Sequence, residues 1–123
     1  MINSETKVLV VEDEPLLRMA AVDILEDAGF LVEEAGSGGE ALRVLKAVPD
    51  MHVLFTDIHM PGEPDGLALA HQTTKEFPTM GIVIVSGRAV PLPQEMPLGA
   101  LFLPKPYEAH HVVSHVRKVV RSV

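Results

Sequence analysis

The stretch VLFTDIHMPG, residues 53–62, combines a short apolar run with an abrupt stop. The run ends at Asp57, and a Met-Pro-Gly sequence at residues 60–62 then interrupts any regular structure. A continuous apolar run of this length, bounded by turn residues, is typical of a strand that is buried on both faces. A carboxylate that directly follows such a strand indicates a polar site at the end of the sheet.

Strand signals alternate with helix signals along the rest of the chain. Apolar runs predict strands at residues 7–11, 30–35, 51–56, 81–86 and 99–104. Apolar residues at helical spacing predict helices that start at Pro15, Ser37 and Gly66, and a last helix around residues 112–120. Because parallel strands need crossover connections, this alternation predicts a parallel sheet with helices on both faces. We therefore expect a three-layer α/β fold of five strands.

Local signals define where the predicted helices begin and end. Pro15 suits the first turn of a helix, and Gly29 ends that helix. Ser37 stands three residues before Glu40, which is the pattern of a capping box. Pro78 follows the third helix, which we expect over residues 66–77. The apolar face that we expect the first helix to bury consists of Leu16, Leu17, Ala20, Ala21, Ile24, Leu25 and Ala28.

The composition narrows the class of protein. The 123 residues are 47% apolar, and a chain of this length can close one core, so we expect a single domain over residues 1–123. The lack of cysteine excludes disulfides, thiolate metal sites and thiol catalysis. No stretch predicts a signal peptide or a membrane span, so we expect a cytoplasmic protein without membrane insertion. A net charge of −7 and a single tyrosine argue against direct binding of nucleic acid.

Polar residues follow four of the five predicted strands. In a parallel sheet these positions share one edge, where ligands bind beside the point at which the strand order reverses. Three neighbouring carboxylates repel one another, and either proton uptake or a bound hard cation relieves the repulsion. Oxygen ligands suit Mg²⁺ or Mn²⁺. The polar residues at these strand ends are Glu12, Asp13, Asp57, Ser86 and Lys105.

These residues, in this order, resemble the receiver domain of two-component response regulators, of the single-domain, CheY-like kind, over essentially the whole chain. The resemblance implies a flavodoxin-like, doubly wound (βα)5 fold with strand order 2-1-3-4-5. It also implies that Asp57 accepts a phosphoryl group from a phosphohistidine on a sensor histidine kinase. Asp13, Asp57 and the backbone carbonyl of His59 would hold Mg²⁺, with Glu12 acting mostly through bound water.

The resemblance assigns roles to further residues. Ser86 and Lys105 would take phosphoryl oxygens, and Phe102 would be the aromatic switch residue that responds together with Ser86. The Lys105–Pro106 peptide bond would be cis. We expect the contact of Lys105 to form only once the phosphoryl group has arrived, so that the unphosphorylated protein barely depends on it. His59 and Arg88 stand at positions that tune hydrolysis of the phosphoryl group in such domains.

Two segments depart from the pattern of these domains. The loop MPGEPDG, residues 60–66, is one residue longer than the commonest form, with Pro64 inserted, and we expect a local displacement there. Residues 87–100 stand where a full fourth helix is usual, but they contain three prolines. Because a proline inside a helix costs about 3 kcal/mol or more, we expect one short turn or an irregular loop. We further expect this segment to be the most mobile part of the protein and to form an unusual surface for a partner.

The resemblance also implies partners. We expect a sensor histidine kinase or a phosphotransfer protein upstream and an effector protein downstream, because 123 residues leave no room for an effector domain. The protein would be a monomer or a weak homodimer, with no direct contact to nucleic acid. It would not act as an enzyme on a separate substrate, since it would catalyse only its own phosphorylation and dephosphorylation.

Two rival functions and one further candidate metal site remain. A pseudo-receiver would keep the fold as an interaction module but would not be phosphorylated. A phosphatase of the haloacid dehalogenase type needs a second acid two residues after its nucleophile, where this chain has His59. His111 and His115 have the spacing of a metal-binding pair on a helix, but with neighbouring His110 they more often form a hydrophilic helix face.

Overall fold

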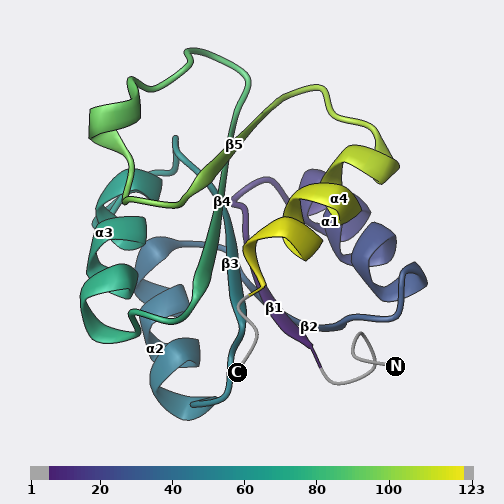
Figure 1. Ribbon diagram of the computed structural model, residues 1–123, viewed down its shortest axis with the longest axis horizontal. Helices are drawn as coiled ribbons and strands as arrows, with labels where there is room; N and C mark the ends of the chain where they lie inside the picture. The colour runs from purple at the N-terminus through teal and green to yellow at the C-terminus, as the bar shows by residue number, and fades with distance from the viewer. Residues whose placement is uncertain (1–5, 121–123) are drawn as a thin grey trace.

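Strands and helices alternate along the chain, as predicted. The computed structural model describes residues 6–120, and Figure 1 shows their path. Residues 1–5 and 121–123 of the predicted domain lie outside the described part. In chain order the elements are β1 (Lys7–Val11), α1 (Pro15–Asp27), β2 (Leu31–Ala35), α2 (Gly38–Ala47), β3 (Val53–Asp57), α3 (Gly66–Glu76), β4 (Gly81–Ser86), the 3₁₀ helix η2 (Pro93–Glu95), β5 (Leu101–Pro104) and α4 (Ala109–Val119).

The five strands form one parallel sheet in the order β2-β1-β3-β4-β5. Helices α2 and α3 cover one face, and α1 and α4 cover the other (Figure 1). The chain runs outward from β1 to β2 and then returns to place β3 on the other side of β1, so the strand order reverses there. This confirms the predicted three-layer α/β fold and its strand order.

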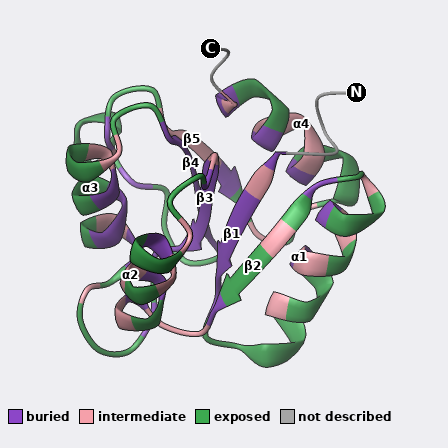
Figure 2. Ribbon diagram, turned by 90° about the horizontal axis from the view of Figure 1, so that it is seen from below, coloured by how far each residue is buried: buried purple, intermediate pink, exposed green. Residues whose placement is uncertain are grey.

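The central strands are buried on both faces. Along β1, Val8 and Val10 pack toward α1 and α4, whereas Leu9 and Val11 pack toward α2 and α3. Every residue of β3 and β4 is buried. Full burial of a valine or leucine side chain contributes about 1.5–3 kcal/mol, which explains why these strands are continuous apolar runs. The strand β2 lies at the edge and is mostly exposed (Figure 2).

Several predicted boundaries differ from the structure by one or two residues. The strand β3 begins at Val53 instead of residue 51 and includes Asp57 as its last residue. The strand β5 begins at Leu101 instead of residue 99, because Gly99 has a φ of 86° and the amide of Ala100 donates to the carbonyl of Pro97 in a turn. The strand β2 starts one residue later than predicted, and α3 ends one residue earlier.

The buried face of α1 is shorter than predicted. In this helix Ala21 and Leu25 are buried, but Leu16 is 73% exposed and Leu17 is 43% exposed. These two leucines lie in the first turn, at the carboxyl edge of the sheet, and Leu17 lines a polar cleft there. The prediction was wrong for this turn because helical spacing identifies a face but not how far along it the neighbouring elements reach.

Side chains cap α1 and α2 at their first turns. The carboxylate of Glu14 accepts a hydrogen bond from the amide of Leu16 at the start of α1. At α2, Ser37 Oγ accepts from the amide of Glu40, as the predicted capping box requires. The second bond of that box differs from the prediction, since the Glu40 carboxylate accepts from the amide of Gly36 and not of Ser37. The cap therefore reaches one residue further back into the β2–α2 loop.

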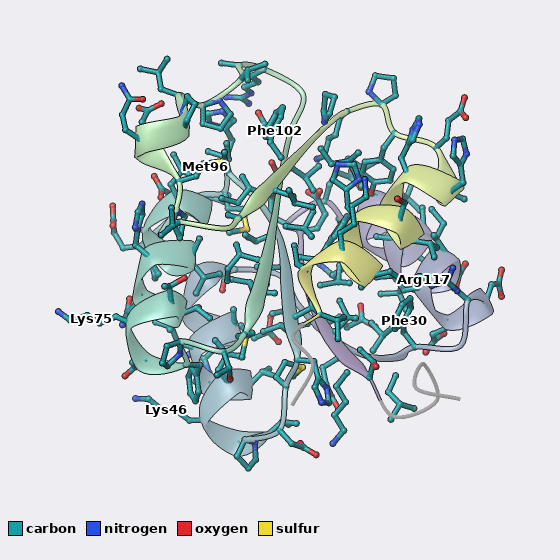
Figure 3. All side chains as sticks on the ribbon, in the orientation of Figure 1. Phe30, Lys46, Lys75, Met96, Phe102 and Arg117 are labelled. Carbon is teal, nitrogen blue, oxygen red and sulfur yellow. The ribbon has the colours of Figure 1, made fainter. Side chains whose placement is uncertain are left out.

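Residues 87–100 contain no α-helix, and η2 is their only regular element, which confirms the predicted short turn. The segment is attached by the buried Pro91 and Pro97 and by Met96, which packs against the apolar cluster on the α3 side (Figure 3). His71 Nε2 of α3 lies 2.7 Å from the carbonyl oxygen of Glu95. Three large apolar side chains of the segment point to solvent, namely Val90, Leu92 and Leu98.

Within residues 6–120, none of the helices combines the length and apolar character that crossing a bilayer requires.

We predict that backbone amides at residues 88–98 exchange with solvent much faster than those of β3 and β4. The backbone hydrogen bonds within the segment join near neighbours, such as the Glu95 amide to the Leu92 carbonyl, whereas the strand amides pair across a buried sheet. Locally bonded segments open at a free-energy cost near zero, and core strands open only at close to the global cost. Hydrogen exchange followed by mass spectrometry measures this. Equal protection in the segment and in β3 would contradict the prediction.

Candidate functional site

Three carboxylates meet at the carboxyl edge of the sheet. Glu12 and Asp13 follow β1, and Asp57 ends β3, which is paired directly with β1. Each of the three side chains offers an oxygen, and these oxygens lie within 4.8 Å of one another. The structure therefore brings together the acids that the strand ends predicted.

The three acids differ in exposure. Glu12 is 6% exposed and Asp57 is 8% exposed, whereas Asp13 lies on the solvent side. Together with Lys105 and neighbouring residues they line an open cleft of about 380 Å³. A molecule that enters the cleft from solvent thus meets Asp13 at the outside and the two buried carboxylates behind it.

Lys105 closes the inner side of this cleft. Its ammonium Nζ donates to Glu12 Oε1 at 2.8 Å and to Asp57 Oδ2 at 3.0 Å. Lys105 is thus already paired without a phosphoryl group, and its contact with an arriving phosphoryl group stays a prediction. Two neighbouring carboxylates that are removed from water need a compensating charge, and the lysine supplies it in the protein by itself.

Burial and ion pairing act in opposite directions on these groups. Burial raises the pKa of Glu12 above its ordinary value of 4.5, although the hydrogen bonds from Lys105 and from the Glu14 amide oppose the increase. Burial by itself lowers the pKa of Lys105, but its hydrogen bonds to Glu12 and Asp57 raise it above 10.5. The ammonium therefore stays charged at neutral pH, and its contribution to stability is lost only as the pH rises through that raised pKa.

Ser86 lies at the end of β4, the strand next to β3. It is 3% exposed, and its Oγ accepts a hydrogen bond from the amide of Arg88 at 3.2 Å. The Ser86 carbonyl accepts from the amide of Lys105 at 2.9 Å, which holds the end of β5 against β4. In the register of the sheet, Asp57 is opposite Val85. The serine is therefore one residue beyond the position opposite the aspartate.

The remaining predicted residues divide into two groups. His59 and Arg88 are exposed and line the cleft, and the amide of His59 points to Asp57 Oδ1 at 3.4 Å. Phe102 instead lies half-buried on β5 and packs against the α3-side cluster that also contacts Met96 (Figure 3). The Lys105–Pro106 bond is cis.

The backbone behind Asp57 is tightly packed. A Cβ atom on Gly66 would lie 1.8 Å from the carbonyl oxygen of Asp57, and the Gly66 amide donates to the carbonyl of Ile58. The carbonyl of Pro64 lies over Gly38 at the start of α2, where a Cβ would come within 2.1 Å. The loop that leads from β3 into α3 thus packs against the start of α2, and its extra length and displacement relative to similar proteins stay predictions.

Sequence reasoning missed Gly66, Tyr107 and Arg18. Tyr107 packs edge-on against Phe55 with the ring centroids 6.1 Å apart, and burial raises its pKa. The guanidinium of Arg18 donates to the main-chain carbonyl of Glu12. A glycine at a helix start was the only available signal for Gly66, and the contacts of the other two join distant segments that the sequence does not reveal.

The contacts of the α4 histidines agree with a hydrophilic helix face better than with a metal-binding pair of His111 and His115. His115 Nδ1 lies 2.9 Å from the carbonyl oxygen of His111, so that ring nitrogen already has a partner. His110 and His111 lie near Glu108 instead, and all three are exposed. These contacts are local to α4 and lie on its solvent side, so a hydrophilic helix face remains our interpretation.

The acidic cluster fits a hard divalent cation. Mg²⁺ prefers carboxylate oxygens and keeps several waters, and an open cleft with one exposed and two buried carboxylates provides both. Lys105 adds a second positive charge beside Asp57. A site with a carboxylate between a cation position and an ammonium is suited to hold an anionic group that carries several oxygens.

Comparison with known proteins identifies relatives of the whole described chain. A family model for the response regulator receiver domain matches residues 8–117. The chain is 33% identical over 127 residues to sensor kinase CckA of Brucella abortus (strain 2308). The aligned region spans 98% of this chain and 13% of CckA. It is also 33% identical over 117 residues to the response regulator receiver protein CpdR of the same organism. That aligned region spans 93% of this chain and 96% of CpdR.

A solved structure agrees with these relatives. The crystal structure of a response regulator receiver protein from Sinorhizobium medicae WSM419 has a TM-score of 0.88 and 29% sequence identity, with 94% of each chain covered.

We predict that Gly66→Ala destabilises the protein by about 1–3 kcal/mol or more, because a methyl group there overlaps the Asp57 carbonyl. Gly39→Ala is the matched control, since its nearest atom would be 3.9 Å away and alanine favours helix by up to about 1 kcal/mol. Urea unfolding gives both values, and amide chemical shifts around Asp57 report its displacement. A neutral Gly66→Ala variant with unchanged shifts would contradict the prediction.

We also predict that Lys105→Met lowers stability at pH 7 by about 1–3 kcal/mol, since it leaves two buried carboxylates without their counter-charge. The deficit should shrink as the pH falls through the raised pKa of Glu12, because protonation removes one of the charges. Added Mg²⁺ should restore more stability to the variant than to the wild type.

Urea unfolding across this pH range measures the effect of Lys105→Met. Lys7→Met is the control, because it removes an ion pair to the exposed Asp50 at the opposite edge of the sheet. Equal stability of the Lys105 and Lys7 variants would show that the buried pair contributes no more than the exposed one and would contradict the prediction.

Proposed function

The chain belongs to the response regulator receiver domain family, and from this membership we propose that it accepts a phosphoryl group on Asp57 and signals by a change of shape. The observation that carries the proposal is the pairing of Asp57 with Lys105 beside the two further acids. A carboxylate held between an ammonium and a cation site is arranged for phosphoryl transfer, in which positioning and charge compensation do most of the work. The proposed unit is one receiver domain over residues 1–123.

In the proposed reaction, an Asp57 oxygen attacks the phosphorus of a phosphohistidine on a sensor histidine kinase or a phosphotransfer protein. A phosphorus–oxygen bond forms, the phosphorus–nitrogen bond breaks, and its electron pair goes to the histidine ring, which takes up a proton. The aspartyl phosphate later loses its phosphoryl group to water. The protein would thus catalyse only its own phosphorylation and dephosphorylation.

The other residues of the cleft have supporting roles in this proposal. Glu12, Asp13, Asp57 and the His59 carbonyl would hold Mg²⁺ or Mn²⁺. The bound cation supplies charge neutralisation for the phosphoryl oxygens.

Charge and hydrogen bonding redistribute once the phosphoryl group is present. Lys105 would exchange its contact with the Asp57 carboxylate for one with a phosphoryl oxygen, and Ser86 Oγ would leave the Arg88 amide to do the same. Because Phe102 on β5 and Met96 of the segment 87–100 pack against the same apolar cluster, a shift of Ser86 would be passed through this cluster to the segment. His59 and Arg88, at the mouth of the cleft, would tune access of water.

The proposed output is protein binding. The exposed apolar residues of the segment 87–100 suit a downstream effector protein. We propose a cytoplasmic monomer or weak homodimer that contacts neither nucleic acid nor membrane directly.

We predict that Asp57→Asn abolishes phosphate uptake from acetyl phosphate with Mg²⁺, because an amide nitrogen or oxygen cannot replace the carboxylate nucleophile. Intact-protein mass spectrometry detects the phosphorylated species. Asp50→Asn, which changes an exposed aspartate outside the cleft, should keep normal uptake.

Two results would contradict the proposed function. Undiminished phosphorylation of Asp57→Asn would move the acceptor to another residue, with Asp13 the nearest candidate. A wild-type protein that takes up neither phosphate nor beryllofluoride would instead be a pseudo-receiver.

A further inference from the structure

Arg18 of α1 forms hydrogen bonds to both β2 and the acidic cleft. Its Nε donates to Glu34 Oε1 on β2 at 3.0 Å, and its Nη1 donates to the main-chain carbonyl of Glu12 at 2.8 Å. The Arg18 side chain is 24% exposed, so most of it is enclosed. The planar guanidinium makes both bonds at once, which a single ammonium does less well.

The carbonyl that Arg18 holds belongs to the peptide between Glu12 and Asp13. On the other side of Glu12, its amide donates to the carbonyl of Ala35 at 3.1 Å. The β1 strand has ended at Val11, so sheet pairing no longer fixes this peptide. Arg18 takes over that task where the chain leaves the sheet.

The surroundings leave room for the guanidinium. A Cβ on Gly36 would lie 3.2 Å from Arg18 Nη1, closer than ordinary van der Waals contact. The side chain of Arg18 therefore passes directly over the backbone of the β2–α2 loop, and any larger residue at position 36 would push it away from Glu12.

We propose that Arg18 is a positioning residue for the acidic cleft, which fixes the peptide between Glu12 and Asp13 and thereby the spacing of their carboxylates for a divalent cation. The inference rests on the proposed binding of Mg²⁺ by this cleft. Residues that orient metal ligands without touching the metal change its affinity by about 10- to 100-fold when replaced.

Charge and positioning predict opposite results for Arg18→Gln. Loss of a positive charge near three carboxylates makes the cleft more negative, which by itself strengthens cation binding. Loss of the hydrogen bond to the Glu12 carbonyl loosens the carboxylate ligands, which weakens cation binding. We expect Mg²⁺ affinity to fall about 10-fold, as measured by titration followed by NMR chemical shifts.

Two further variants separate the causes. Arg18→Gln combined with Glu34→Gln leaves the net charge unchanged and should bind Mg²⁺ about as weakly as Arg18→Gln alone. Arg18→Lys keeps the charge but cannot make both hydrogen bonds in the same geometry. Its Mg²⁺ affinity should lie between those of the wild type and Arg18→Gln. The control, Lys7→Gln with Asp50→Asn, removes an ion pair of 2.9 Å at the opposite sheet edge and should bind like the wild type.

A metal-free measurement tests the same role independently. NMR relaxation of the amides of residues 12–14 should show increased motion in Arg18→Gln and not in the Lys7 and Asp50 control. Unchanged motion, or Mg²⁺ affinity equal to or above that of the wild type in Arg18→Gln, overturns the proposal. A wild type that does not bind Mg²⁺ overturns the proposed cation role instead, and the role of Arg18 is then decided by the metal-free spectra.

Discussion

The ammonium of Lys105, held between Glu12 and Asp57, is the interaction on which the arrangement of the site depends. Two carboxylates that are each less than 10% exposed repel each other and lose their hydration. The cis peptide bond to Pro106 follows directly after the lysine, and the amide of Lys105 is fixed to the Ser86 carbonyl. The lysine therefore reaches the acids from a backbone that two neighbouring strands hold in place.

The frame around this ion pair is built from backbone contacts. Gly66 lets the start of α3 lie against the Asp57 carbonyl, and Arg18 holds the peptide after Glu12. The main chain of the acids is thus held in place, while their side chains face the cleft. Such a division lets the side chains respond to ligands without movement of the sheet.

The sequence was sufficient for most of the fold and for the membership of the site. Continuous apolar runs at β1, β3 and β4 are typical of a parallel sheet that is covered on both faces. Parallel strands also bring their carboxyl ends to one edge of the sheet. The strand order came from the resemblance, since alternation alone permits several orders. What sequence could not provide were contacts between distant segments: the bond from Arg18 to a carbonyl, the close approach at Gly66 and the exposure of Leu16. The three prolines succeeded as signals because their effect on a helix is local.

The placement of Lys105 has a consequence for how long a cation stays in the cleft. On the proposed function, an arriving Mg²⁺ finds Glu12 and Asp57 already paired with the ammonium and must draw them partly away from it. The free energy of the ion pair is therefore subtracted from the free energy of cation binding. Weak binding at an ordinary association rate means a short residence time. Cation exchange would then be fast compared with the slow events of signalling, and the loading of the cleft would follow the surrounding Mg²⁺ concentration from moment to moment.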